Sequence, residues 1–199
     1  MSVDVRIRSY KAIVESVLLY NCGTWSLSEA LAEKLDCFQR KMLRRVLNVK
    51  WSDKVTNEQL YQRSDATPIS IQVVDARWRL FGHTLRLDKD TPARMAMAYY
   101  FNKDHPGRKG NLTTIASVLS NDYMAATGLS IKSLKEYSSM VEYAQDRDKW
   151  RELVDNVVTA QWVLRERKEQ CRAEKRLAAK RKRDEQDSVS TASTRRRVS

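Results

Sequence analysis

Apolar residues recur at helical spacing along most of this chain. Within residues 5–20 they share one side of a helix, at Tyr10, Ile13, Val14, Val17 and Leu18. Such spacing at i, i+3, i+4, i+7 and i+8 predicts an amphipathic helix. Gly23 suits the left-handed position after its last turn.

A second helix is expected after a capping box formed by Ser26 and Glu29. Its predicted apolar face consists of Leu31, Leu35, Phe38, Met42 and Val46. Its predicted solvated face carries the cations Arg40, Lys41, Arg44 and Arg45. One side of this helix should therefore pack and the other should meet solvent.

A weaker capping box, Thr56 with Gln59, predicts a short helix that ends near Ser64. After the chain break at Pro68, a helix is expected over 69–87. Its apolar face consists of Ile71, Val74, Trp78, Phe81 and Leu85. Gly82 interrupts this helix, and because glycine costs about 1 kcal/mol there relative to alanine, it indicates close packing or a kink.

Shorter helical stretches follow over 95–101, 113–126, 130–137 and 141–158, and Gly128 ends the second of them. No stretch alternates apolar and polar residues as a strand would, so the predicted class is all-α. We expect a helical bundle over 1–102, a smaller helical segment over 103–160, a long basic helix over 161–183 and a disordered Ser/Thr/Arg tail over 184–199.

The distribution of charge along the chain predicts a partner with phosphate groups. The net charge is +12, and residues 164–199 hold 13 Lys and Arg against 6 Asp and Glu. Such a surplus attracts phosphate backbones without reading sequence. The longest apolar run is broken by Lys11, Glu15 and Asn21, so no membrane span and no signal peptide are expected. The predicted location is intracellular, and the basic run near the C-terminus favours the nucleus.

Four segments, in order, carry a resemblance. They are YKAIVESVLLYNCGTW (10–25), FQRKMLRRVLNVKWSDKVTNEQL (38–60), RWRLFGHTLRL (77–87) and AQDRDKWRELV (144–154). Together they resemble the region downstream of the polymerase core in non-LTR (LINE-type) retrotransposon reverse transcriptases. The resemblance implies a thumb and C-terminal region of an RNA-directed DNA polymerase, with the catalytic core expected upstream.

Catalysis is not expected from this chain alone. Polymerisation needs paired aspartates that hold divalent metal ions, and no Asp-Asp pair occurs in the sequence. Three cysteines without a CxxC pair and two histidines follow no metal-ligand spacing. We therefore expect no metal, no cofactor and no small-molecule substrate, and we expect RNA or DNA as partner.

Candidate contacts with nucleic acid fall in three places. The first is the block Arg40, Lys41, Arg44 and Arg45, whose guanidinium groups suit phosphate oxygens; an ordinary solvated helix face is the alternative. The second is the loop at Arg108 and Lys109, between glycines. The third is Lys180, Arg181, Lys182 and Arg183, a pattern typical of nuclear import or of non-specific binding.

Other features have a structural interpretation beside the functional one. Trp78 and Trp150 share apolar faces and are expected in the core, whereas Trp51 follows Lys50 outside a helix and is open to base stacking. The alternating charges from Asp146 to Lys149 are interpreted as surface ion pairs. Two rival hypotheses for the whole chain are a non-functional element remnant and a helical protein-interaction module.

Overall fold

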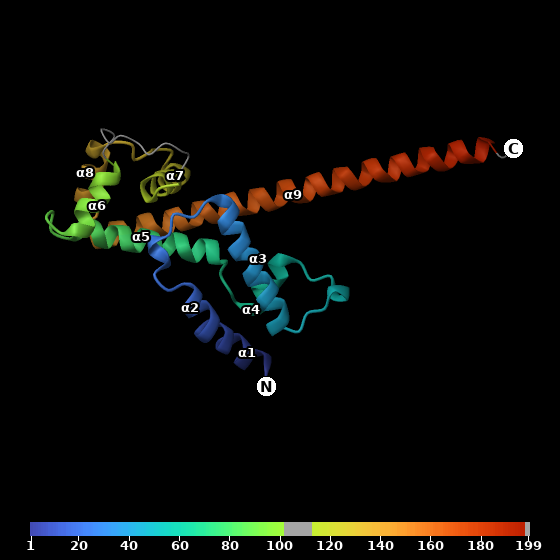
Figure 1. Ribbon diagram of the computed structural model, residues 1–199, viewed down its shortest axis with the longest axis horizontal. Coiled ribbons are helices and arrows are strands. Elements are labelled where there is room, and N and C mark those ends of the chain that lie inside the picture. The colour runs from blue at the N-terminus through green and yellow to red at the C-terminus, as the bar shows by residue number, and fades with distance from the viewer. Residues whose placement is uncertain (102–112, 198–199) are drawn as a thin grey trace. The chain divides into compact units, whose positions relative to one another are not determined.

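All regular structure in the described part of the chain is helical. The computed structural model describes residues 1–101 and 113–197, with side chains as far as residue 181. Every element in these ranges is a helix or a helical turn, so the predicted all-α class is confirmed (Figure 1). The chain divides into two units, Met1–Ala160 and Gln161–Ser199. No helix begins at residue 161, where the basic helix was predicted to start; one helix, α9 (Arg147–Arg197), runs through this position.

The predicted N-terminal helix is present as three consecutive pieces, α1 (Val3–Ser9), the π-helical η1 (Tyr10–Glu15) and α2 (Ser16–Leu18). In a π-helical turn the amide bonds five residues back, as Ser16 N–H does to the carbonyl of Lys11. The extra residue rotates the following side chains relative to an α-helix. Ile13 is consequently 67% exposed and Glu15 is buried, which corrects the predicted apolar face.

The turn after α2 packs against a helix far along the chain. Asn21, not Gly23, takes the left-handed conformation, with φ of 53°. Gly23 lies in the 3-10 turn η2 (Cys22–Thr24). A Cβ at Gly23 would lie 3.0 Å from the carbonyl oxygen of Ala76. The glycine therefore permits close approach rather than a turn conformation, which corrects the predicted role.

Helix α3 (Glu29–Val46) is capped at its N-terminus by Ser28, whose hydroxyl accepts from Leu31 N–H at 3.4 Å. The predicted cap at Ser26 was wrong. The predicted face of α3 was right only in part: Leu35, Met42 and Val46 are half-buried and pack against apolar clusters, whereas Leu31 and Phe38 are exposed. The residues buried in α3 are Asp36, Gln39, Arg40 and Leu43. Most of this buried face is polar, so hydrophobic periodicity could not locate it.

Gln39 explains why a polar side chain belongs there. It is fully buried, and its Nε2 donates to Glu15 Oε1 at 2.6 Å and to the carbonyl of Thr67 at 2.8 Å. Its Oε1 accepts from Tyr61 Oη at 3.3 Å and from Ile69 N–H at 3.1 Å. A buried polar group is costly unless it is paired, and this amide has partners for both its donors and its acceptor.

The neighbouring Asp36 caps the helix that follows Pro68. Its Oδ1 accepts from Ser70 N–H at 3.0 Å, and its Oδ2 accepts from Ser70 Oγ at 2.8 Å. Helix α5 (Ile69–Arg86) starts after Pro68, which has no side-chain cap to offer. Because a helix N-terminus attracts negative charge and needs acceptors for its free N–H groups, α3 supplies what the local sequence lacks.

Two other sequence predictions are confirmed in this region. Helix α4 (Asn57–Ser64) begins with the reciprocal hydrogen bonds of a Thr56 and Gln59 capping box. In α5 the whole predicted apolar face is buried, namely Ile71, Val74, Trp78, Phe81 and Leu85. Unlike α3, this helix buries an apolar stripe, which periodicity detects well.

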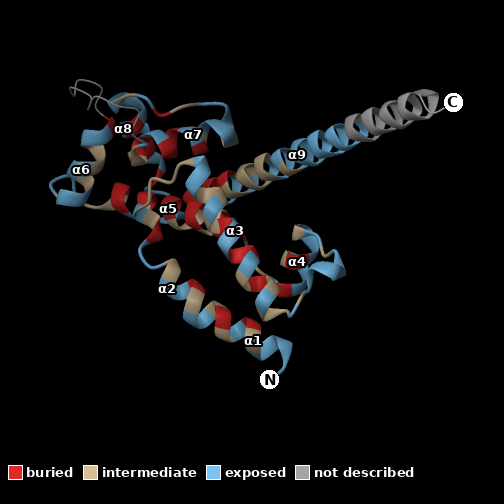
Figure 2. Ribbon diagram, turned by 45° about the vertical axis from the view of Figure 1, so that its right-hand side comes forward, coloured by how far each residue is buried: buried red, intermediate tan, exposed pale blue. Residues whose placement is uncertain are grey.

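Around the second half of α5 lie α6 (Pro92–Phe101), α7 (Ile115–Thr127), α8 (Leu134–Tyr143) and the first turns of α9 (Arg147–Arg197). Figure 2 shows buried residues concentrated where these helices face α5. One apolar core includes residues on both sides of the boundary predicted at 102/103, from Val74 to Phe101 and from Ala116 to Val157. The predicted boundary therefore does not divide the core of the first unit.

A buried ion pair ties α5 to α7. Arg77 Nη2 donates to Asp122 Oδ2 at 2.6 Å, and Trp78 Nε1 donates to the same oxygen at 3.2 Å. Both charged side chains are almost completely buried. Loss of either partner would leave an uncompensated charge in the interior, which is strongly destabilising.

Trp150 in α9 fits against α5 at Gly82. A Cβ added to Gly82 would lie 2.1 Å from Trp150 Nε1. That nitrogen donates to the carbonyl of Trp78 at 3.3 Å. Trp150 also contacts Phe81 edge-on, with ring centroids 5.8 Å apart. Close packing, one of the two predicted roles of Gly82, is confirmed, as is the burial of Trp78 and Trp150.

The second unit consists of the rest of α9. Its described side chains from Cys171 to Arg181 are all exposed, and Arg165 pairs with Glu169 at 3.1 Å. The backbone is helical to Arg197. The side chains of the stretch predicted to be disordered, 184–199, lie outside the described residues, so disorder there stays a prediction.

Substituting Gly82 with alanine should destabilise the first unit. The new methyl group overlaps the Trp150 indole, and overpacking outweighs the roughly 1 kcal/mol that alanine gains in a helix. We expect a decrease of about 2 kcal/mol or more in the free energy of unfolding, measured by urea denaturation. His83→Ala, at an exposed position on the same helix, is the control and should change little. Equal stability of Gly82→Ala and the wild type would contradict the packing described.

Glu15→Gln should change how stability depends on pH. Burial raises the pKa of Glu15, although hydrogen bonds from Gln39 and Gln72 and the charge of Lys11 oppose this. A carboxyl whose pKa is raised on folding loses stability as pH rises from its ordinary pKa through its folded pKa. We therefore expect the variant to gain stability relative to the wild type as pH rises above the ordinary carboxyl pKa of about 4, measured by urea denaturation at each pH. Parallel curves would show that Glu15 ionises freely in the folded chain.

Candidate nucleic-acid interface

The basic block predicted on α3 does not form one solvated face. Arg40 is only 8% exposed, and its Nη2 donates to Glu33 Oε1 at 3.0 Å and contacts Cys37 Sγ at 2.9 Å. It adjoins Gln39 on the buried side of the helix, so its prediction as a solvent-facing contact is wrong. Arg44 is half-buried and donates to Asn57 Oδ1 at 2.9 Å. Lys41 and Arg45 are exposed.

The other predicted contacts are only partly described. Arg108 and Lys109 lie outside the described residues. Lys180 and Arg181 are exposed in the second unit, and the side chains of Lys182 and Arg183 again lie outside the described part of the chain.

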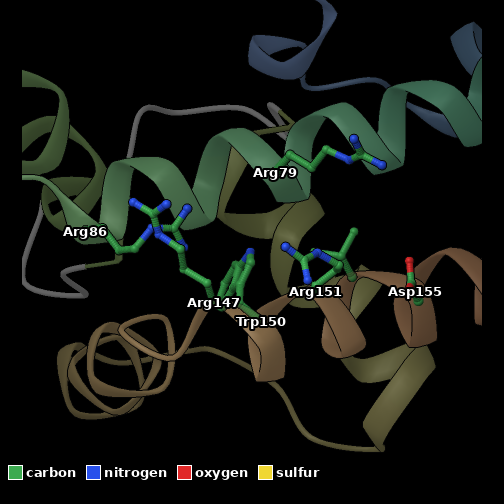
Figure 3. A pocket seen from close by; sticks show the side chains of 7 residues that line it. Arg79, Arg86, Arg147, Trp150, Arg151 and Asp155 are labelled. Carbon is green, nitrogen blue, oxygen red and sulfur yellow. The ribbon is translucent and has the colours of Figure 1, made fainter.

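The structure brings together a different set of cations, between α5 and the first turns of α9. They line an open pocket of about 250 Å³. Its lining consists of Arg79, Arg86, Arg147, Trp150, Arg151, Val154 and Asp155. Figure 3 shows Arg86 and Arg147 reaching toward each other from the two helices, with Arg79 and Asp155 farther along. We call this the arginine pocket.

Trp150 fixes the geometry of the arginine pocket. Its indole occupies the space that Gly82 leaves open, so α5 and α9 approach closely at this point. Arg86 is one helical turn beyond Gly82, and Arg147 is nearly one turn before Trp150. Arg86 is further held by a hydrogen bond from its Nη1 to the carbonyl of Ala144 at 3.2 Å. The guanidinium groups are therefore carried by rigid helices rather than by loops.

The positive charges of Arg86 and Arg147 repel each other at the arginine pocket. Partial burial, and secondly the positive charge of Arg147, lower the pKa of Arg86. Arg147 is the first residue of α9, where a cation opposes the helix dipole. Among the described residues, no carboxylate lies within ion-pair distance of Arg147. A bound anion would relieve both costs.

The remaining arginines of the pocket are paired. Arg79 donates to Asp75 at 2.8 Å, and Arg151 donates to Asp148 at 2.9 Å. Asp146 bonds Lys149 at 3.1 Å, so surface ion pairs are confirmed for part of the charged stretch from Asp146 to Lys149. Exposed pairs of this kind contribute little. Arg79 and Arg151 can thus exchange a carboxylate for a phosphate at small cost.

No protein-family model matches the chain. Comparisons with curated proteins and with solved structures also find no match. No helix in the described parts of the chain is both long and apolar enough to cross a membrane. Within the same ranges, no three His, Cys, Asp or Glu side chains gather in a way that could hold a metal ion.

The arginine pocket was missed at the level of sequence because its two sides are about seventy residues apart. A signal was nevertheless present. The segments 77–87 and 144–154, which carry the resemblance, each hold two of the four arginines, and they also hold Gly82 and Trp150. Pairing the small residue of one segment with the large aromatic of the other would have placed the cations together.

Arg147→Gln should stabilise the folded chain slightly. It removes a cation from the N-terminus of α9 and relieves the repulsion with Arg86, for a gain of about 0.5 kcal/mol. Thermal melting at low ionic strength measures this gain, which salt should reduce. Lys89→Gln, an exposed substitution of equal charge, serves as the control. A destabilised Arg147→Gln would mean that Arg147 supports the fold, against the electrostatic interpretation.

Proposed function

We propose that this chain binds nucleic acid and that the arginine pocket holds a phosphate of the backbone. The observation that carries the proposal is the convergence of Arg86 and Arg147 on the arginine pocket. Burial, and secondly the charge of Arg147, lower the pKa of Arg86. Cations held together at a cost to the fold are typical of a site whose partner supplies the opposite charge.

Guanidinium chemistry favours phosphate as that partner. Each guanidinium presents N–H donors in a planar fork, which suits two oxygens of one phosphate. The pocket is open to solvent and has a volume of about 250 Å³, enough for one phosphate group. Because the pocket is not enclosed, a chain of phosphates can pass across it.

The wider charge supports a polymer rather than a single anion. The net charge is +12, and Lys180 and Arg181 are exposed in the second unit. Several phosphates bound at once release several counterions, which is the main source of non-specific affinity for nucleic acid. We assign backbone binding, and no base-specific recognition, to these groups.

We further propose that the chain corresponds to the thumb and C-terminal region of a non-LTR retrotransposon reverse transcriptase. Four segments in the expected order support this proposal. The contact between Gly82 and Trp150 adds support, because it joins two of these segments at the proposed binding site. The role assigned to this chain is to grip template and primer, and the chemistry is assigned to a polymerase core.

Replacing both Arg86 and Arg147 with glutamine should weaken binding to a labelled nucleic-acid duplex by about a hundredfold or more, since charged hydrogen bonds contribute roughly 1.5–3 kcal/mol each. Fluorescence anisotropy at several salt concentrations measures the effect. The slope of log affinity against log salt should fall by about 0.9 for each phosphate that the double variant no longer binds.

The matched control is Lys34→Gln with Lys89→Gln, which removes the same charge at exposed positions outside the pocket. An equal decrease in affinity in both double variants would mean that the arginines of the pocket contribute only through their net charge and do not form a specific phosphate site. Binding by the wild-type chain that does not depend on salt would contradict the proposed function as a whole.

A further inference from the structure

Trp51 presents its side chain almost entirely to solvent. It is 95% exposed, more than any other large apolar side chain in the described part of the chain. Tryptophan is normally well buried, because its large apolar surface is costly to hydrate. This indole contributes nothing to the core, so packing does not account for it.

The turn that carries Trp51 is nevertheless well defined. It is the 3-10 turn η3 (Trp51–Asp53), between α3 and α4. Asp53 Oδ2 accepts from Lys50 N–H at 2.8 Å and closes the turn. Asn48 and Lys54, on either side, adopt left-handed conformations with φ of 54° and 48°. Asn48 ends α3 in a Schellman motif, in which Val49 N–H bonds to the carbonyl of Arg44 at 2.9 Å, and Lys54 ends η3. The backbone on both sides of Trp51 is therefore fixed.

A cationic hollow lies beside this indole. It has a volume of about 570 Å³, and it is lined by Arg44, Val49, Lys50, Trp51, Lys54 and Val55. Three of these residues are cations and none is acidic. Arg44 is anchored by its bond to Asn57 Oδ1. The carboxylate of nearby Asp53 is engaged within the turn by Lys50 N–H and by Ser52 Oγ at 3.2 Å.

We propose that Trp51 stacks on an unpaired base of a single-stranded nucleic acid, with Arg44, Lys50 and Lys54 contacting its phosphates. An exposed aromatic ring flanked by cations is the combination by which proteins bind single strands without reading sequence. The faces of paired bases are covered by their neighbours in a duplex, so this site distinguishes single strands from duplex. The hollow is large enough for one nucleotide.

This inference rests on the proposed function but concerns a separate site. The arginine pocket lies on α5 and α9, whereas the Trp51 site lies between α3 and α4. The pocket takes backbone phosphate from any strand. The Trp51 site adds a preference for strands whose bases are free.

The test compares Trp51→Ala and Trp51→Phe with the wild-type full chain. Each is titrated into a labelled oligothymidine of about 12 nucleotides and into a blunt duplex at the same salt concentration. We expect Trp51→Ala to bind the single strand about tenfold more weakly, and Trp51→Phe to retain most of the affinity. Duplex binding and the salt slope should be unchanged in both, because both variants keep every charge.

Tryptophan fluorescence gives a second readout. The single strand should quench the emission of the wild type more than that of Trp51→Phe, which lacks the stacking indole. Both variants should melt at the wild-type temperature, since the side chain buries almost nothing.

Unchanged single-strand affinity in Trp51→Ala would overturn the inference, and so would an equal decrease for single strand and duplex. An indole used for a protein partner would give the first of these results. Failure of the arginine pocket would appear elsewhere, as unchanged duplex binding after substitution of Arg86 and Arg147. The two proposals therefore fail in different measurements.

Discussion

The closeness of α5 and α9 at Gly82 and Trp150 is the constraint on which the first unit depends. The indole takes the volume that any side chain at position 82 would need, and its N–H donates to the carbonyl of Trp78. The aromatic residues of the core continue from this contact, because Phe81 stacks on Phe101 with centroids 6.0 Å apart. The same contact sets the distance between Arg86 and Arg147. Stability and the proposed site thus share one structural cause.

A second constraint is polar. Gln39 and Asp36 join η1, α4 and α5 through a buried set of hydrogen bonds. Apolar contacts alone would allow these helices to slide against one another. Hydrogen bonds with fixed donors and acceptors select one arrangement, since any other leaves buried groups unpaired. The polar residues here define the geometry that the apolar residues stabilise.

Whether a helix face was predicted correctly from the sequence depended on whether its buried residues are apolar or polar. In α5 an apolar stripe meets the core, and both its extent and its face were predicted. In α3 the fully buried face carries Asp36, Gln39 and Arg40, whose polar character hides it from hydrophobic periodicity. Only Leu35, Met42 and Val46 of the predicted apolar face pack inward. In η1 a π-helical turn displaced the pattern and turned Glu15 inward. The arginine pocket was not predicted because the proximity of α5 and α9 is a property of the tertiary structure. The solvent exposure of Trp51 was predictable, because its position in the sequence lies outside the predicted helices.

The capping of α5 by α3 has a consequence for folding. The acceptors for the amides of Ile69 and Ser70 lie 30 and 34 residues earlier in the chain. The first turn of α5 therefore cannot complete its hydrogen bonds as an isolated segment, and it becomes ordered only when α3 has docked. Helix initiation at this point is a cooperative event between two distant stretches, which links local secondary structure directly to assembly of the whole unit.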